Sequence, residues 1–299
     1  MNHSTHVAPL GLVLATFALC GGCGDDFSPY NEVEGFRLLA IQATPPELRP
    51  GERVELTALV VGDDAPRFTW RWCAVTRGPG ERHTCAIQDG EIESELPNAL
   101  LSTSTSATFA WPADPSVTDA FCDVAAQREA PNGAPRLDCA SDRPELYVRL
   151  EIESAAGERV IALHALPLVL DDAPRNLNPH LDDVRVEVAG AMKPIEGARI
   201  DGEVQLELLV PEAAAETYGT NADDREILRA TWFVTGGETD AMRTVFIPGD
   251  AAATFAALTR NAWTLPTAPR DVTLYLVLRD DRGGVSWLVR RAVVEGGAS

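Results

Sequence analysis

Two cysteines, Cys20 and Cys23, are separated by two glycines, and their spacing is the first along the chain that can support chemistry. A Cys-x-x-Cys pair exchanges disulfides when it opens a helix after a strand, and two such pairs can bind zinc. No strand–helix–strand pattern follows this pair, and the sequence contains no second pair with this spacing. We therefore expect neither redox chemistry nor a metal site here.

The residues before the pair are typical of an exported protein. Residues 7–19 form an apolar stretch that is too short for a membrane span, which needs about 20 residues. The stretch fits the apolar region of a signal peptide, although residues 1–6 contain no Lys or Arg. We expect export of the chain, with either a lipoprotein signal or a plain secretory signal.

The same stretch resembles a bacterial lipoprotein signal, in which small residues precede a cysteine that is lipidated and becomes the new N-terminus. Cys23 matches best because two glycines precede it, whereas Cys20 follows the larger Leu19. The resemblance implies a signal peptide over residues 1–22 and a lipid anchor in the bacterial cell envelope, with the outer membrane or cell surface favoured. Residues 23–35 are then a short lipidated tether.

Four further cysteines lie in the first half of the chain: Cys73, Cys85, Cys122 and Cys139. An even number of cysteines in an exported chain favours disulfides. Three pairings are possible, and we favour Cys73–Cys85 with Cys122–Cys139 because each pair encloses a turn-rich loop. The alternative is a zinc site of four thiolates, and the spacings fit no common zinc motif.

Paired aspartates occur six times, and Asp is common in turns. Four of these residues flank a segment rich in Asn and Pro: Asp171, Asp172, Asp182 and Asp183. Carboxylates and backbone oxygens are the ligands that Ca²⁺ prefers. The simplest interpretation is that these residues form turns, and calcium at this segment is the alternative. No other metal and no cofactor are expected.

The net charge of -20 makes nucleic acid an improbable class of partner, because an acidic chain repels phosphate backbones. No signature of a metalloprotease, serine hydrolase, nucleotide-binding loop or dinucleotide fold occurs in the sequence. We therefore do not expect an enzyme. A hydrolase with carboxylates from distant strands is the remaining catalytic alternative.

The elements that must position these residues are β-strands. Residues 53–61 alternate between polar and apolar side chains in their first half, which predicts a strand. Residues 145–170 predict a hairpin with a turn at Ala156-Gly157, and residues 272–295 predict another with a turn at residues 282–284. No long helical period occurs before Leu170, so no helix is expected there.

The strands fall into two sets with the same order of landmarks. Trp70 or Trp72 corresponds to Trp232, and Tyr147 corresponds to Tyr275. Such short strands predict an all-β fold of two tandem antiparallel sandwiches, in which the tryptophans are core anchors. An exposed aromatic platform for sugars is the alternative role for the tryptophans, and Trp287 is its main candidate.

The strand layout resembles bacterial Ig-like and fibronectin-type modules, without the cysteines of a true immunoglobulin bridge. The predicted modules span residues 36–172, with a disulfide-bearing insertion at 113–144, and residues 183–299, and a linker at 173–182 joins them. With the anchor, this organisation resembles uncharacterised bacterial surface lipoproteins. It implies a non-catalytic binding module for an envelope protein or glycan. The alternative is a structural spacer or assembly accessory of an envelope complex, and a secreted hydrolase is third.

Overall fold

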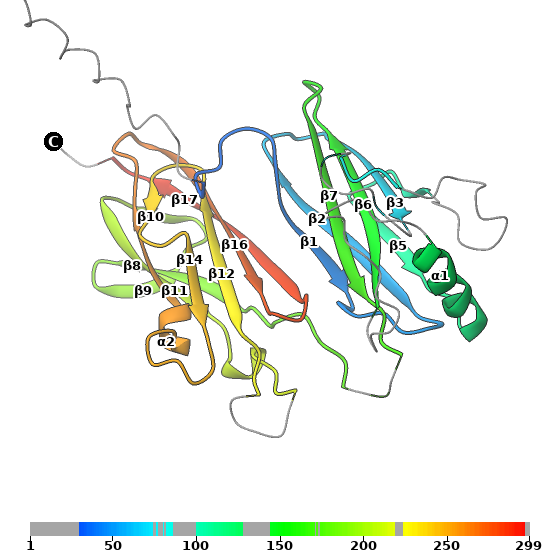
Figure 1. Cartoon of the computed structure of the whole chain (residues 1–299). Coiled ribbons are helices and arrows are strands. Elements are labelled where there is room, and N and C mark those ends of the chain that lie inside the picture. Colours follow the sequence, from blue (N-terminus) through cyan, green and yellow to red (C-terminus); the bar gives the residue numbers. More distant parts are fainter. Residues whose placement is uncertain are drawn as a thin grey trace, which may run out of the picture.

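The chain folds mainly into antiparallel β-sheet, arranged as two sandwiches that lie side by side (Figure 1). This confirms the predicted all-β fold of Ig-like sandwich modules. The structure is a computed structural model, and it describes residues 30–73, 76, 80, 82–85, 100–127, 144–170, 172, 174–218 and 224–296.

The first sandwich packs a sheet of strand order β1-β2-β5 against a sheet of order β4-β3-β6-β7. In a constant-type immunoglobulin sandwich, the fourth strand extends the sheet that contains the first, second and fifth strands. Here β4 pairs with β3 instead, so it belongs to the opposite sheet. The strands are β1 (Arg37–Thr44), β2 (Arg53–Val61), β3 (Arg67–Cys73), β4 (Leu100–Ser102), β5 (Ser106–Ala110), β6 (Glu145–Glu153) and β7 (Arg159–Pro167).

The second sandwich packs a sheet of order β13-β15-β11-β8-β9 against a sheet of order β10-β17-β16-β12-β14. Its pairings are antiparallel except that of β10 with β17, which is parallel. The strands are β8 (Asp183–Val188), β9 (Ala191–Pro194), β10 (Ala198–Ile200), β11 (Glu203–Leu209), β12 (Leu228–Val234), β13 (Glu238–Thr239), β14 (Arg243–Phe246), β15 (Arg260–Thr264), β16 (Arg270–Arg279) and β17 (Val285–Val294). The short helices are η2 (Glu212–Ala214) and α2 (Phe255–Leu258).

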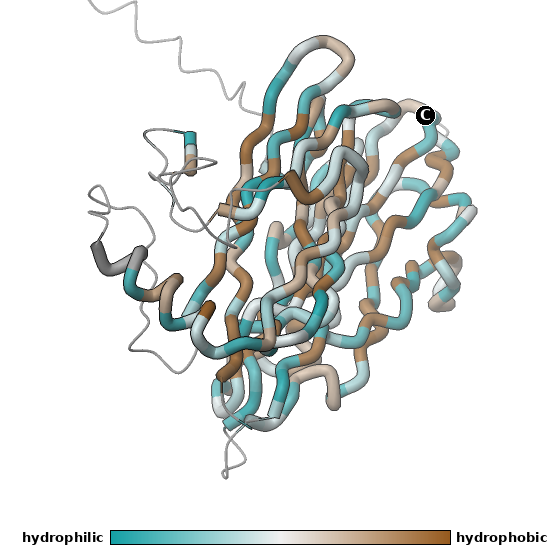
Figure 2. Tube along the Cα trace, turned by 90° about the vertical axis from the view of Figure 1, so that its right-hand side faces the viewer, coloured by the Kyte–Doolittle hydropathy of each residue, from teal (hydrophilic) through white to brown (hydrophobic). Residues whose placement is uncertain are grey.

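Alternating side chains build the cores of both sandwiches. In β2, Val54 and Leu56 are buried, whereas Arg53 and Glu55, which alternate with them, are exposed. Apolar and polar residues alternate in the same way along several strands in Figure 2. Successive side chains of a strand point to opposite faces, so this alternation directs one apolar face of each sheet toward its partner sheet.

Five of the six tryptophans are core residues, as predicted: Trp70, Trp72, Trp111, Trp232 and Trp263 are each at most 2% exposed. Four of their indole N–H groups have acceptors inside the protein. The acceptors are the carbonyls of Ser104 and Gly236 and the hydroxyls of Thr118 and Thr244, at 2.9–3.0 Å. The matching landmarks also hold, because β3 and β12 each carry a buried tryptophan beside the penultimate strand of their sandwich.

Helix α1 (Pro115–Gln127) was not expected from the sequence. It begins after Asp114, whose carboxylate accepts the backbone N–H of Ser116 at 2.9 Å. Its apolar residues Val117 and Phe121 pack on the first core, and the ring of Phe121 lies 5.3 Å from that of Trp111. An acidic cap, a proline at the first helical position and an i, i+4 apolar pair are helix signals, but they cover little more than one turn.

Candidate functional site

A third apolar core joins the two sandwiches, and we call this region the seam. It is formed by outward-facing residues of β1 and β2 and by outward-facing residues of β12, β16 and β17. Its buried members are Leu39, Ala40, Leu59, Val61, Phe233, Val277 and Val285. Buried apolar contact on this scale holds the sandwiches against each other.

A β-bulge in β1 explains how one strand serves two cores. The pairing of β1 with β2 shifts register between Leu38 and Ala40. A bulge places an extra residue in one strand and interrupts the regular alternation. Consequently, Leu39 and Ala40 both face the seam, whereas Leu38 and Ala43 face the first core. The sequence pattern of β1 alone does not distinguish these two directions.

Side-chain amides close the seam beside its apolar core. Asn178, in the segment that connects the sandwiches, donates to the backbone carbonyl of Ala43 at 2.8 Å and accepts the N–H of Val285 at 2.8 Å. Gln42 donates to the carbonyl of Val285 at 2.6 Å. The connecting segment thus makes specific contacts with both sandwiches, although its Asn and Pro content is typical of a linker.

Three buried carboxylates surround one arginine at the end of the seam. Arg282 lies 3.2 Å from Glu47 and 3.3 Å from Glu226, whose side chains are 1% and 0% exposed. Asp280 accepts the backbone N–H of Arg282 at 2.8 Å and the side-chain amide of Asn176 at 3.2 Å. We call these five residues the seam network, which links the turn after β1, the connecting segment and the β16–β17 hairpin.

The network carries more acidic than basic groups, and its titration reflects that imbalance. Burial, together with the charge of Asp280, raises the pKa of Glu226 from 4.5 to about 7, although Arg282 acts in the opposite direction. Burial also raises the pKa of Asp280. Around neutral pH, Glu226 therefore exchanges a proton with solvent, and the net charge inside the seam changes with it.

Gly284 is required by the close packing of the hairpin turn. A Cβ atom at this position would lie 2.1 Å from Oδ2 of Asp280 and 2.8 Å from the carbonyl oxygen of Leu177. The backbone N–H of Gly284 also donates to Asp280 at 2.7 Å. Gly284 of the predicted β16–β17 turn thus allows the connecting segment to approach the hairpin.

An open pocket of about 300 Å³ lies beside the seam. It is lined by Gln42 of β1, by Asn178, His180 and Leu181 of the connecting segment, and by Ser286 and Trp287 of β17. This volume is at the lower end of the range for ligand sites. The pocket brings together side chains from three distant parts of the sequence.

Two of the four aspartates proposed from the sequence as calcium ligands have side-chain partners within the protein. Asp182 lies 2.7 Å from His180, and Asp183 lies 2.7 Å from Arg290. Asp171 lies outside the described residues. Within the described ranges, no group of three or more His, Cys, Asp or Glu side chains is arranged to hold a metal ion. Calcium at this segment stays a prediction, because the ligand set includes a residue that the structure does not describe.

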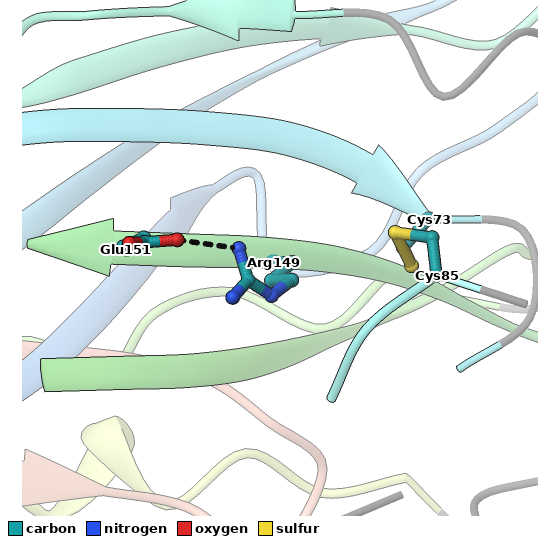
Figure 3. Close-up of a disulfide and its surroundings, with 4 residues drawn as sticks. All are labelled: Cys73, Cys85, Arg149 and Glu151. Atoms are coloured by element: carbon teal, nitrogen blue, oxygen red, sulfur yellow. Dashed lines mark hydrogen bonds and ion pairs between the residues drawn. A yellow bond between two sulfur atoms is a disulfide. The ribbon is translucent and has the colours of Figure 1, made fainter. Parts of the chain in front are cut away.

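The Cys73–Cys85 disulfide is present as predicted and closes the end of β3 (Figure 3). It lies near the outer face of β6, where Arg149 forms an ion pair with Glu151 at 3.0 Å. Cys122 is also disulfide-bonded. Its expected partner, Cys139, lies outside the described residues.

The N-terminal segment contacts the second sandwich before it enters the first. The N–H of Val33 donates to the carbonyl of Val234 at 2.7 Å, and the N–H of Val234 donates to Asn31 at 2.9 Å. The buried amide of Asn31 also donates to Thr239 at 2.7 Å. Part of the predicted tether is therefore fixed at the end of β12. Cys23, the predicted lipidation site, lies outside the described residues, and no helix within the described ranges has the length and apolarity to cross a membrane.

Sequence reasoning missed the seam network. Glu47 follows a pair of prolines, and Glu226 lies among other polar residues, so neither has a local signal of burial. Asp280 belongs to an Asp-Asp pair that is typical of a turn, and this interpretation is correct but incomplete. The one feature of the network that stands out in the sequence is Arg282, a charged residue in a Gly-rich hairpin turn.

Comparison with known proteins adds little detail. No protein-family model matches the chain, and no curated protein matches its sequence. Among solved structures, it aligns with the fibronectin(III)-like modules of Clostridium thermocellum CbhA at 9% identity, covering 85% of this chain and 93% of that one, with a TM-score of 0.21. It also aligns with three N-terminal domains of the bacteriophage RB49 outer capsid protein Hoc at 12% identity, covering 88% and 71%, with a TM-score of 0.23. It aligns with the FN1–FN3 domains of chicken CNTN1 at 13% identity, covering 88% of this chain and 65% of that one, with a TM-score of 0.22. At such TM-scores, the description of the fold depends on the sheets themselves.

Proposed function

We propose that the chain is a lipid-anchored protein of the bacterial cell envelope that acts by binding and not by catalysis. One observation carries the proposal: the seam holds an open pocket whose lining comes from both sandwiches and from the segment between them. Binding sites occur preferentially where domains meet, and a fixed arrangement reduces the entropy lost on binding. The ligand is an envelope protein or glycan, and the acidic charge of the chain argues against nucleic acid.

The proposed anchor and the seam are compatible in space. The chain between Cys23 and Tyr30 spans at most about 25 Å when it is fully extended. The docked segment beyond it contacts Val234, at one end of β12. The seam network lies near Leu228, at the other end of that strand, about 20 Å away. A lipid at Cys23 would thus hold the second sandwich near the membrane and leave the seam network at the distant end.

The anchor is tested by the intact mass of the full-length protein extracted from cells with detergent. The proposal predicts a chain that begins at Cys23 and carries acyl groups, and it predicts that Cys23→Ala releases the protein from the membrane fraction. Cys20→Ala is the matched control and should keep the lipid. A wild-type protein without acyl groups would contradict the anchored part of the proposal.

The second candidate is a structural spacer or assembly accessory. The seam core favours it, because a rigid connection between the modules is what a spacer requires. The two candidates predict different effects of surface substitutions. A binding protein should lose its crosslinked complex in cells when residues lining the pocket are changed, whereas a spacer should tolerate them and fail only when the seam core is disrupted.

A further inference from the structure

The pocket opens onto a stretch of β17 that, within the described residues, is hydrogen-bonded to a strand on one side only. β17 pairs with β16 along its whole length, from Val285 to Val294. On its other side, β17 pairs with β10 only at residues 292–294. Unpaired strand edges expose backbone donors and acceptors, and most proteins protect them.

Protein groups cover this edge at both ends of the unpaired stretch. The backbone N–H of Asp280 donates to the carbonyl of Gly284. Backbone bonding alternates along an antiparallel strand, so the even-numbered residues of β17 direct their N–H and carbonyl groups toward β16. The odd-numbered residues of β17 direct their N–H and carbonyl groups outward, away from β16. At Val285, the outward N–H and carbonyl are bonded to Asn178 and Gln42. At Arg291, they are bonded to the carboxylate of Glu196 and the N–H of Gly197.

Residues 286–290 lie between these covered positions, and we call them the open edge. Within the part of the chain that the structure describes, the outward N–H and carbonyl of Trp287 and the N–H of Val289 have no partner. The carbonyl of Val289 accepts from the guanidinium of the adjacent Arg290, at 3.0 Å. The open edge therefore offers a short row of backbone groups directly beside the pocket.

The side chains of the open edge are also suited to a protein ligand. Trp287 is half-buried against the seam core and lines the pocket, and Val289 is 36% exposed. Extended peptides bind in this way, with backbone bonds to a strand edge and with alternate side chains in pockets. A sugar platform is less favoured, because the other five tryptophans are buried in the cores.

We propose that the open edge binds an extended segment of a partner protein as an added strand, and that one side chain of this segment enters the pocket. The segment carries basic residues beside its apolar ones, because the chain as a whole has a net charge of -20 and the one cation of the open edge, Arg290, is paired with Asp183. This inference depends on the proposed binding function and specifies the chemistry of the partner.

The probe is an array of peptides of about six residues, with Val, Ile or Phe at alternate positions between lysines, which matches the length of the open edge. Each peptide has a copy that is N-methylated at alternate amides and cannot donate to a strand. We expect binding to slow hydrogen exchange at the amides of Trp287 and Val289. Val289→Pro should weaken binding about tenfold, and Val289→Ala, which keeps the N–H, should weaken it less than about threefold.

The N-methylated peptides test the inference on the unaltered protein, independently of how Val289→Pro folds. Equal affinity for both sets of peptides would overturn it, as would protection at another surface or no binding at about 1 mM peptide. Self-association through the open edge, or protection of Trp287 by a neutral oligosaccharide alone, would also overturn it. If the protein is lipidated and crosslinks to a partner elsewhere, only this inference fails. If it lacks lipid, the anchored function fails whatever the peptides show.

Discussion

Replacing Arg282 with Met should destabilise the protein far more than a surface charge replacement. The substitution keeps much of the apolar stem but leaves Glu47 and Glu226 buried without the cation that lies 3.2 and 3.3 Å from them. Removing one partner of a buried ion pair costs about 3–5 kcal/mol. Because Glu226 can take up a proton, we expect about 3 kcal/mol at pH 8 and a smaller loss at pH 6.

The matched control is Arg199→Met. Arg199 also pairs with a carboxylate, Glu295, at 3.1 Å, but its side chain is 75% exposed. Exposed pairs contribute at most about 1 kcal/mol, so this variant should remain close to the wild type at both pH values. A further variant that combines Arg282→Met with Glu47→Gln and Glu226→Gln should recover more than half of the lost stability, because it also removes the two buried negative charges that Arg282 balances.

The assay is urea unfolding of the mature chain, followed by tryptophan fluorescence at pH 6 and pH 8. The indoles of both cores report on unfolding, and a change in the slope of the transition would reveal whether the sandwiches separate before they unfold. If Arg282→Met costs no more than Arg199→Met, or if its cost does not change with pH, the seam network does not hold the sandwiches together.

Three further predictions concern other parts of the account. Burial raises the pKa of Glu226 to about 7, so folding favours its protonated form. The free energy of unfolding should therefore fall as the pH rises from about 5 to 8. Glu226→Gln should flatten that decline, measured by urea unfolding. Gly284→Ala should cost at least about 2 kcal/mol, because its Cβ would clash with a carboxylate, whereas Gly236→Ala has ordinary contacts and should be tolerated. Replacing Cys73 and Cys85 together with Ser should lower stability by about 2–3 kcal/mol, and an unchanged urea midpoint would show that the bond contributes nothing.

Local patterns in the sequence were sufficient to predict the longer strands of both sandwiches, but not the short strands β4, β9, β10, β13 and β14. The alternation at Val54 and Leu56 indicates which face of β2 packs against the opposite sheet. The turn glycines indicate where the two hairpins reverse direction. Tryptophans are large enough that their burial follows from the fold class. These features depend on neighbouring residues, so a single sequence contains them.

The seam depends on contacts between distant residues and could not be predicted in the same way. In the sequence, Leu39 and Ala40 have the pattern of ordinary strand residues, but the β-bulge directs both side chains toward the second sandwich. Glu47 and Arg282 are separated by 235 positions, and nothing near either of them indicates the other. The segment at residues 174–182 has the composition of a linker, but its amides bond to both sandwiches.

The most direct test of the proposed function is site-specific photocrosslinking in living cells with the full-length chain. A crosslinker replaces Leu177, which is 56% exposed at the seam, and in a parallel strain it replaces Met192, which is 37% exposed on β9. We predict a discrete adduct with an envelope protein from position 177 and none from position 192. Equal labelling from both positions, or no adduct from the seam, would contradict a binding role for this region.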